Sequence, residues 1–216
     1  MKETLKDLFS NWKTIPNLLS FLRILMVPVF AVLFMHGHYG WSIFVLALSG
    51  LSDFFDGKIA RRFNQISSLG KILDPLADKL TQITIAVVFF ITFWKAEDKW
   101  VHYISLIFLI FLIKEAVMVL GSVAMIILGL RPGAAEMPGK VATFAFYLIM
   151  ISIMAFGPEI GIFRESLFEY PPQVMAVLVV ISAILIIVAF CGYIPGVKQQ
   201  LREKKEKEAA QAAEKQ

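Results

Sequence analysis

The chain contains six long apolar stretches. They cover residues 15–35, 41–63, 74–94, 100–129, 139–157 and 171–194, and each is near or above the roughly 20 residues that a helix needs to cross a bilayer. With 58% hydrophobic and 18% charged residues, the chain is far more apolar than a soluble domain of this length. We therefore expect an all-α integral membrane protein with six transmembrane helices.

The segments outside these stretches complete the predicted organisation. Over residues 1–13, apolar side chains recur at i, i+3, i+4 and i+7, in Leu5, Leu8, Phe9 and Trp12. This spacing predicts a short amphipathic helix in the membrane interface, with an ordinary solvated helix as the alternative. Residues 14–197 would form the six-helix domain, and the charged segment 198–216 would form a tail.

The distribution of lysine and arginine predicts the orientation in the membrane. These residues are concentrated in the N-terminal segment, in 58–71, in 131–140 and in the tail. The positive-inside rule places that side in the cytoplasm, and an even number of spans puts both termini there. A short chain without a transit peptide fits a bacterial cytoplasmic membrane. The lone cysteine, Cys191, gives no disulfide framework and no cysteine metal site.

Four aspartates interrupt the apolar pattern around the second and third spans. Asp53, Asp56, Gly57 and Ala60 follow one another at i, i+3, i+4 and i+7, which places them on one face of a helix. The small residues leave room for a bulky group beside the two carboxylates. Two further carboxylates, Asp74 and Asp78, also share a face, one turn apart. If the second and third spans pack antiparallel, the two pairs converge at the cytoplasmic side.

A cluster of four carboxylates at a membrane surface needs compensating positive charge. An unpaired carboxylate at the centre of a membrane helix costs roughly 2.5–3.5 kcal/mol. Hard divalent cations prefer oxygen ligands, and Mg²⁺ in particular combines carboxylates with substrate phosphates. The pattern therefore predicts a metal site open to the cytoplasm. Structural alternatives are an N-cap at Asp74 before Pro75, pairing of Asp78 with Lys79 or Lys71, and pairing of Asp56 with Arg61.

The complete pattern resembles the motif of the CDP-alcohol phosphatidyltransferase family. That motif consists of eight fixed residues over 26 positions, and here these are Asp53, Asp56, Gly57, Ala60, Arg61, Gly70, Asp74 and Asp78. The six-span layout also resembles the family. The segment TIPNLLSFLRI (14–24) is similar to the start of phosphatidylglycerophosphate and cardiolipin synthases.

The resemblance implies a reaction in which an alcohol attacks CDP-diacylglycerol and releases CMP. It implies two divalent cations, Mg²⁺ or Mn²⁺, held by Asp53, Asp56 and Asp74 with help from Asp78. It also implies that Asp78 is the general base, and that the CDP-lipid is bound by Gly57, Ala60, Arg61 and Gly70. A homodimer is expected from the family, and no nucleic acid partner is expected.

Cationic residues in the later spans bear on the acceptor alcohol. Lys114 lies within the fourth span beside Glu115, and Arg131 and Lys140 precede or open the fifth. These three cations are candidates for an acceptor-phosphate pocket, although Lys114 could instead pair with an acid for packing alone. Glycerol-3-phosphate is the favoured acceptor. This sequence departs from phosphatidylglycerophosphate synthases at two positions: Lys114 stands where they usually have an arginine, and Ala142 stands where they have a second lysine. Phosphatidylglycerol therefore stays open as the alternative acceptor. Inositol phosphate and serine are further options.

Other classes of membrane protein explain the pattern less well. Aromatic prenyltransferases carry their acidic motifs on distant helices, whereas both pairs here lie within 26 residues. An ion transporter would place its acids near the midplane in broken helices, often in repeated halves. No nucleophile–histidine arrangement competes, and His36, His38 and His102 are interpreted as interfacial residues.

Overall fold

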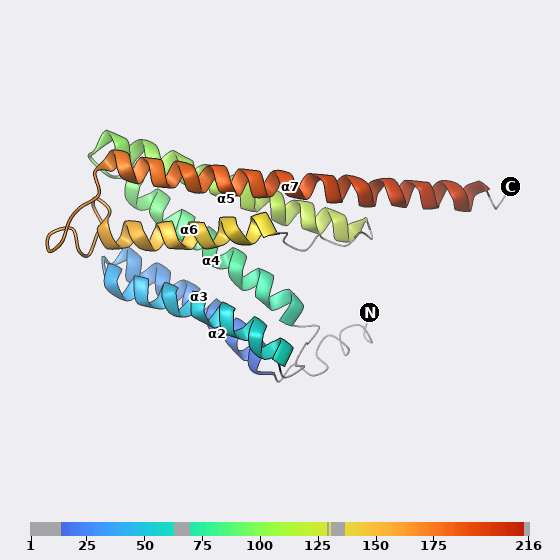
Figure 1. Cartoon of the computed structure of the whole chain (residues 1–216), viewed down its shortest axis with the longest axis horizontal. Helices are drawn as coiled ribbons and strands as arrows, with labels where there is room; N and C mark the ends of the chain where they lie inside the picture. The colour runs from blue at the N-terminus through green and yellow to red at the C-terminus, as the bar shows by residue number, and fades with distance from the viewer. Residues whose placement is uncertain (1–13, 63–69, 129, 131–136, 214–216) are drawn as a thin grey trace.

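The computed structural model describes residues 14–62, 70–128, 130 and 137–213, and its regular elements over these residues are all helices. The helices, shown in Figure 1, are α2 (Ile15–Met35), α3 (Tyr39–Arg62), α4 (Gly70–Trp94), α5 (Lys99–Ile127), α6 (Met137–Phe156) and α7 (Pro172–Ala213). Five of them are long and apolar enough to cross a membrane. Over the residues that are described in full, the apolar part of α3 is the shorter stretch Tyr39–Ser52. The predicted all-α membrane fold is confirmed.

Local sequence explains how α2 begins and ends. Thr14 precedes the helix in an extended conformation, and its hydroxyl accepts a hydrogen bond from the backbone N–H of Asn17 at 3.3 Å. Pro16 occupies the first turn, where its missing N–H costs nothing. After Met35 the chain turns at Gly37, whose φ of 77° is readily adopted only by glycine, and α3 follows two residues later.

Two helices differ from the spans expected from the sequence. α4 begins at Gly70, so Asp74 lies inside the helix and the interpretation of Asp74 as an N-cap is wrong. α7 continues through Pro195 to Ala213, so the described part of the charged tail is helical. Lys204 in this extension donates a hydrogen bond of 2.7 Å to the backbone carbonyl of Leu128, just beyond the end of α5. The predicted helix over residues 1–13 lies outside the described residues.

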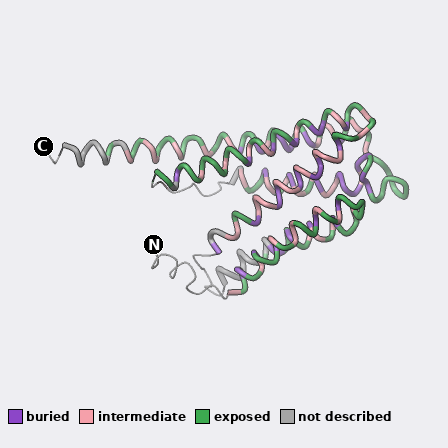
Figure 2. Tube along the Cα trace, turned by 180° about the vertical axis from the view of Figure 1, so that it is seen from behind, coloured by how far each residue is buried: buried purple, intermediate pink, exposed green. Residues whose placement is uncertain are grey.

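Aromatic rings contact one another through the interior of the bundle, among aliphatic and methionine side chains. Phe34 of α2 contacts Phe89 of α4 at a centroid distance of 5.0 Å, and Phe89 contacts Phe108 of α5 at 5.3 Å. Many large apolar side chains instead point outward, as expected for helices that face lipid rather than water. Figure 2 shows the buried positions on the inward faces of the helices.

The arrangement of the helices determines where the site lies. Among the described residues, α2 packs extensively against both α3 and α4, and the other main contact of α3 is with α6. The direct packing of α3 on α4 expected from the sequence involves the last turns of α3, whose side chains lie outside the description, so it stays a prediction. The first residues of α2 and α4 and the last residues of α3 lie at the same end of the bundle (Figure 1). We call it the aspartate end.

Candidate functional site

The eight residues of the aspartate motif lie on α3 and α4. Asp53, Asp56, Gly57, Ala60 and Arg61 belong to the last turns of α3, and the helical backbone there puts the first four on one face, as predicted. The side chains of these α3 residues lie outside the description. Gly70 is buried at the start of α4, with Asp74 and Asp78 in the turns that follow.

Asp74 is held by the first membrane helix. The hydroxyl of Ser20, on α2, donates a hydrogen bond to Oδ1 of Asp74. Ser20 is completely buried, whereas Asp74 is partly exposed. The carboxylate is therefore fixed from the buried side and open toward the surface. Asn17 and Arg23, three residues before and after Ser20, are also buried, so α2 has a polar stripe within an otherwise apolar helix.

Asp78 accepts hydrogen bonds on both of its carboxylate oxygens. Gln82, one turn later on α4, donates from Nε2 to Oδ2 at 2.8 Å. Tyr147 of α6 donates its hydroxyl proton to Oδ1 at 3.3 Å. Both bonds restrict the rotation of the carboxylate.

A buried glutamate joins two lysines beside the aspartates. Glu115 of α5 is 3% exposed, and its Oε2 lies 2.6 Å from Nζ of Lys79, which follows Asp78 on α4. Its other oxygen, Oε1, forms an ion pair with Lys114. The proposed pairing of Lys79 with Asp78 is thus replaced by a pairing with Glu115. The three groups together carry a net charge of +1 when all are ionised.

The three cations predicted to bind the acceptor differ in their surroundings and in whether the structure describes them. Lys114 is partly buried and paired with Glu115, so the acid pairing considered for it is confirmed. Lys140 is exposed near the start of α6. Arg131 lies outside the described residues. A shared pocket for these three groups stays a prediction.

The described carboxylates fit a hard divalent cation. Asp74 and Asp78 offer only oxygen donors and are one helical turn apart, partly exposed at a membrane surface. Over the described residues, no group of three His, Cys, Asp or Glu side chains is close enough to hold a metal ion. The other two predicted ligands, Asp53 and Asp56, have side chains outside that search.

Sequence reasoning missed Ser20, Gln82 and Tyr147, together with the partner of Lys79. Gln82 was accessible from its i, i+4 spacing to Asp78, and Ser20 from the polar stripe on α2. Tyr147 lies 69 residues from Asp78 and no local pattern connects them.

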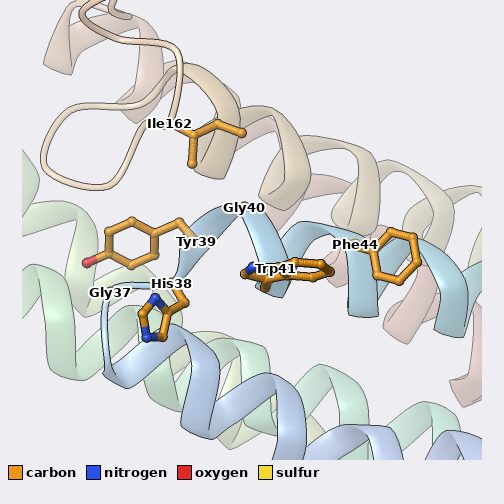
Figure 3. Close-up of a pocket in the computed structure, with 7 residues that line it drawn as sticks. All are labelled: Gly37, His38, Tyr39, Gly40, Trp41, Phe44 and Ile162. Atoms are coloured by element: carbon orange, nitrogen blue, oxygen red, sulfur yellow. The ribbon is translucent and has the colours of Figure 1, made fainter.

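A hollow of about 530 Å³ lies away from the aspartates, at the opposite end of the bundle. It is open to the surface and lined by Gly37, His38, Tyr39, Gly40, Trp41, Phe44 and Ile162 (Figure 3). It contains none of the predicted site residues. Its aromatic lining is typical of side chains at a membrane interface.

Comparison with known proteins agrees with the aspartate motif. The family model for CDP-alcohol phosphatidyltransferase matches residues 13–189. A cardiolipin synthase (CMP-forming) of Streptomyces coelicolor is 39% identical over 149 residues, covering 64% of this chain and 66% of that protein. The human cardiolipin synthase (CMP-forming) is 49% identical over 75 residues, 34% of this chain and 25% of the human protein.

A relative with a different name matches over a greater length. A CDP-diacylglycerol–glycerol-3-phosphate 3-phosphatidyltransferase of Aquifex aeolicus is 30% identical over 190 residues, covering 88% of this chain and 99% of that protein. This chain therefore spans less than two thirds of the two cardiolipin synthases but nearly all of the Aquifex enzyme.

Proposed function

Because this chain belongs to the CDP-alcohol phosphatidyltransferase family, we propose that it transfers a phosphatidyl group from CDP-diacylglycerol to glycerol-3-phosphate. The products are phosphatidylglycerophosphate and CMP. The observation that carries the proposal is the complete aspartate motif on two helices whose motif-bearing ends lie together (Figure 1). The Aquifex relative supports the choice of acceptor, because it matches over almost its whole length.

The proposed reaction assigns Asp78 as the general base. The acceptor hydroxyl gives its proton to Asp78 as its oxygen forms a bond to the phosphatidyl phosphorus, and the bond from that phosphorus to the CMP oxygen breaks. Gln82 and Tyr147 hold the carboxylate in place for this transfer. Two divalent cations, Mg²⁺ or Mn²⁺, held by Asp53, Asp56, Asp74 and Asp78, would neutralise the phosphate charge.

The remaining residues of the motif are assigned to the CDP-lipid. Gly57, Ala60 and Gly70 let the nucleotide approach the backbone, and Arg61 binds its phosphates. In this proposal the aspartate end faces the cytoplasm of a bacterium, from which a soluble acceptor enters. The protein acts as a homodimer in the cytoplasmic membrane.

Lys114, Arg131 and Lys140 are proposed to bind the acceptor phosphate. Replacement of Lys140 by alanine should raise the KM for a phosphate-bearing acceptor. This lysine is exposed and forms no ion pair with a described side chain, so its charge is available to a phosphate. An unchanged KM would remove Lys140 from the pocket. The KM for CDP-diacylglycerol, measured in the same assay, serves as the internal control.

Phosphatidylglycerol is a second candidate acceptor. Two observations favour it. The two cardiolipin synthases are more identical to this chain than the Aquifex enzyme is, although over shorter alignments, and the cluster of Lys79, Lys114 and Glu115 has a net charge of +1. That charge matches a phosphodiester, which carries a single negative charge. In both acceptors, a glycerol carries a phosphate and a free hydroxyl. The same base and the same CDP-lipid could therefore serve either one.

The test measures CMP release by the purified protein from radiolabelled CDP-diacylglycerol with Mg²⁺ or Mn²⁺. Glycerol-3-phosphate and phosphatidylglycerol are supplied in separate reactions. We expect metal-dependent release with glycerol-3-phosphate, whereas release with phosphatidylglycerol alone would transfer the assignment to the second candidate. No metal-dependent release with any acceptor would contradict the transferase activity.

A further inference from the structure

The buried hydroxyl of Ser20 lies between two acceptors. One is the backbone carbonyl of Pro16, 2.9 Å away and one turn earlier on α2, and the other is Oδ1 of Asp74 on α4. A serine hydroxyl has one proton and can donate to only one acceptor at a time. A hydrogen bond to a carboxylate is roughly twice as strong as one to a neutral carbonyl, so the proton is directed to Asp74.

We propose that Ser20 is a positioning residue for Asp74, which it holds so that the second carboxylate oxygen is available to a divalent cation. This inference rests on the metal site of the proposed function. It assigns a role to the first membrane helix, which carries no residue of the aspartate motif. Ser20 would act through Asp74 and need not touch the metal or the substrate.

The surroundings of Ser20 are suited to such a role. Its side chain is 0% exposed, so water cannot replace its hydrogen bond to Asp74. Two features hold the turn that carries Ser20 in place: the Thr14 cap at the start of α2 and the extensive contact of α2 with α4. Polar groups that orient a metal ligand typically change metal affinity by about 10–100-fold when they are lost.

A merely structural hydrogen bond between α2 and α4 would behave differently. Its loss would lower thermal stability and leave the affinity of the folded protein for a metal unchanged. The affinity for Mn²⁺ alone, measured on folded protein, therefore separates the two roles without relying on enzyme activity.

Ser42 provides a matched control in the neighbouring helix. It is also 0% exposed, and its hydroxyl donates to the carbonyl of His38 one turn earlier, at 3.0 Å. It lies near the start of α3, at the end of the bundle away from the aspartates (Figure 1). Replacement of Ser42 by alanine removes the same chemical group from an equally buried place.

The experiment compares five forms of the full chain in phosphatidylcholine nanodiscs: unaltered, Ser20→Ala, Ser20→Thr, Ser20→Val and Ser42→Ala. Mn²⁺ is titrated and its free concentration is followed by electron paramagnetic resonance. We expect Ser20→Ala and Ser20→Val to raise the Kd for Mn²⁺ about tenfold. Ser20→Thr and Ser42→Ala should stay within about twofold of the unaltered protein, because both keep the hydroxyl beside Asp74.

Threonine and valine have nearly the same shape, so this pair isolates the hydroxyl even if the alanine variant does not fold. Equal Mn²⁺ affinities for the threonine and valine variants would overturn the inference. An unaltered protein that binds no Mn²⁺ would contradict the metal site itself and this inference with it. A normal affinity in the unaltered protein and in Ser20→Val would overturn the inference about Ser20 alone.

Discussion

The two ends of the helix bundle are held together by different kinds of interaction. Toward the end away from the aspartates, rings of α2, α4 and α5 contact one another, as in the pairs Phe34–Phe89 and Phe93–Phe108. At the aspartate end, the helices are joined by hydrogen bonds and an ion pair from Ser20, Lys79 and Tyr147. Three helices, α2, α4 and α5, contribute to both regions, and α6 contributes Tyr147 to the polar one.

This difference separates stability from chemistry. Contacts between rings are numerous, individually weak and weakly directional, so another apolar side chain can replace much of their contribution. Polar groups inside a bundle depend on particular partners, and a group that loses its partner is left uncompensated. Substitutions in the aromatic region should therefore change mainly the stability, whereas substitutions among the polar contacts should change turnover as well.

The largest expected effect on turnover is that of Asp78→Asn. The amide keeps the shape of the side chain but cannot take the proton of the acceptor hydroxyl, and general bases typically contribute about 10²–10⁴-fold to a rate. We expect kcat for CMP release to fall within that range while binding of CDP-diacylglycerol in the presence of metal largely survives. Unchanged turnover would refute the assignment of Asp78 as base.

Asp98→Asn is the matched control for this substitution. Asp98 accepts hydrogen bonds from the backbone N–H groups of Trp100 and Val101 at the start of α5, away from the aspartate end. Asparagine is as good a helix cap as aspartate. Both variants lose one carboxylate, but only Asp78→Asn should lose activity.

Glu115→Gln should have the next largest effect, on both stability and turnover. It leaves Lys79 and Lys114 close together without the acid that both contact, and removal of one member of a buried ion pair costs about 3–5 kcal/mol. We expect a clear fall in the thermal unfolding midpoint, measured in detergent, and a lower kcat because Lys79 adjoins Asp78.

The control for that variant is Glu165→Gln. Glu165 is 88% exposed and its nearest contact with Arg164 is 3.8 Å, so its loss should change stability by less than about 1 kcal/mol. If the two glutamine variants were equally stable, the ion-pair cluster at Glu115 would contribute nothing to holding α4 and α5 together.

The sequence predicted what depends on composition and helical spacing. The apolar stretches located most helix boundaries to within a few residues, and the i, i+3, i+4 and i+7 spacing placed Asp53, Asp56, Gly57 and Ala60 on one helical face. It failed at Asp74, where Pro75 suggested the first turn of a helix. The helix instead begins at Gly70 and tolerates the missing N–H of Pro75 close to its start.

Contacts between distant helices could not be predicted in the same way. Sequence spacing offers Asp78 as one possible partner of Lys79, but the ion pair of Lys79 is with Glu115, 36 residues away on α5. The partner of Asp78 on α6 is further still along the chain. Such pairs depend on how each helix is rotated about its axis, and a single sequence taken alone carries no signal for that rotation.

Tyr147→Phe tests a single hydrogen bond at the aspartate end. The ring stays in place and only the hydroxyl that donates to Asp78 is lost, at a distance of 3.3 Å. A hydrogen bond to a charged group contributes about 1.5–3 kcal/mol, and this long one belongs at the lower limit, so kcat should fall roughly tenfold. The KM for CDP-diacylglycerol should not change, because the bond orients the base rather than the lipid.

Tyr170→Phe removes a comparable hydroxyl at the other end of the bundle. Tyr170 shares a hydrogen bond of 2.8 Å with Ser152 of α6. We expect turnover to be unaffected and the unfolding midpoint to fall slightly. Equal losses of kcat in the two phenylalanine variants would mean that Tyr147 acts through the packing of α6 and not through Asp78.

The smallest expected effect on turnover is that of Phe89→Leu in the aromatic region. Phe89 is completely buried and its ring contacts Phe34, Phe93 and Phe108, so the smaller side chain should lower the free energy of unfolding by about 1–2 kcal/mol. Because leucine still fills most of this apolar space, the orientation of Asp74 and Asp78 should persist and kcat per folded molecule should stay within twofold. A tenfold fall in kcat with little loss of stability would show that the aromatic contacts set the geometry of the aspartates, and the separation between the two ends would not hold.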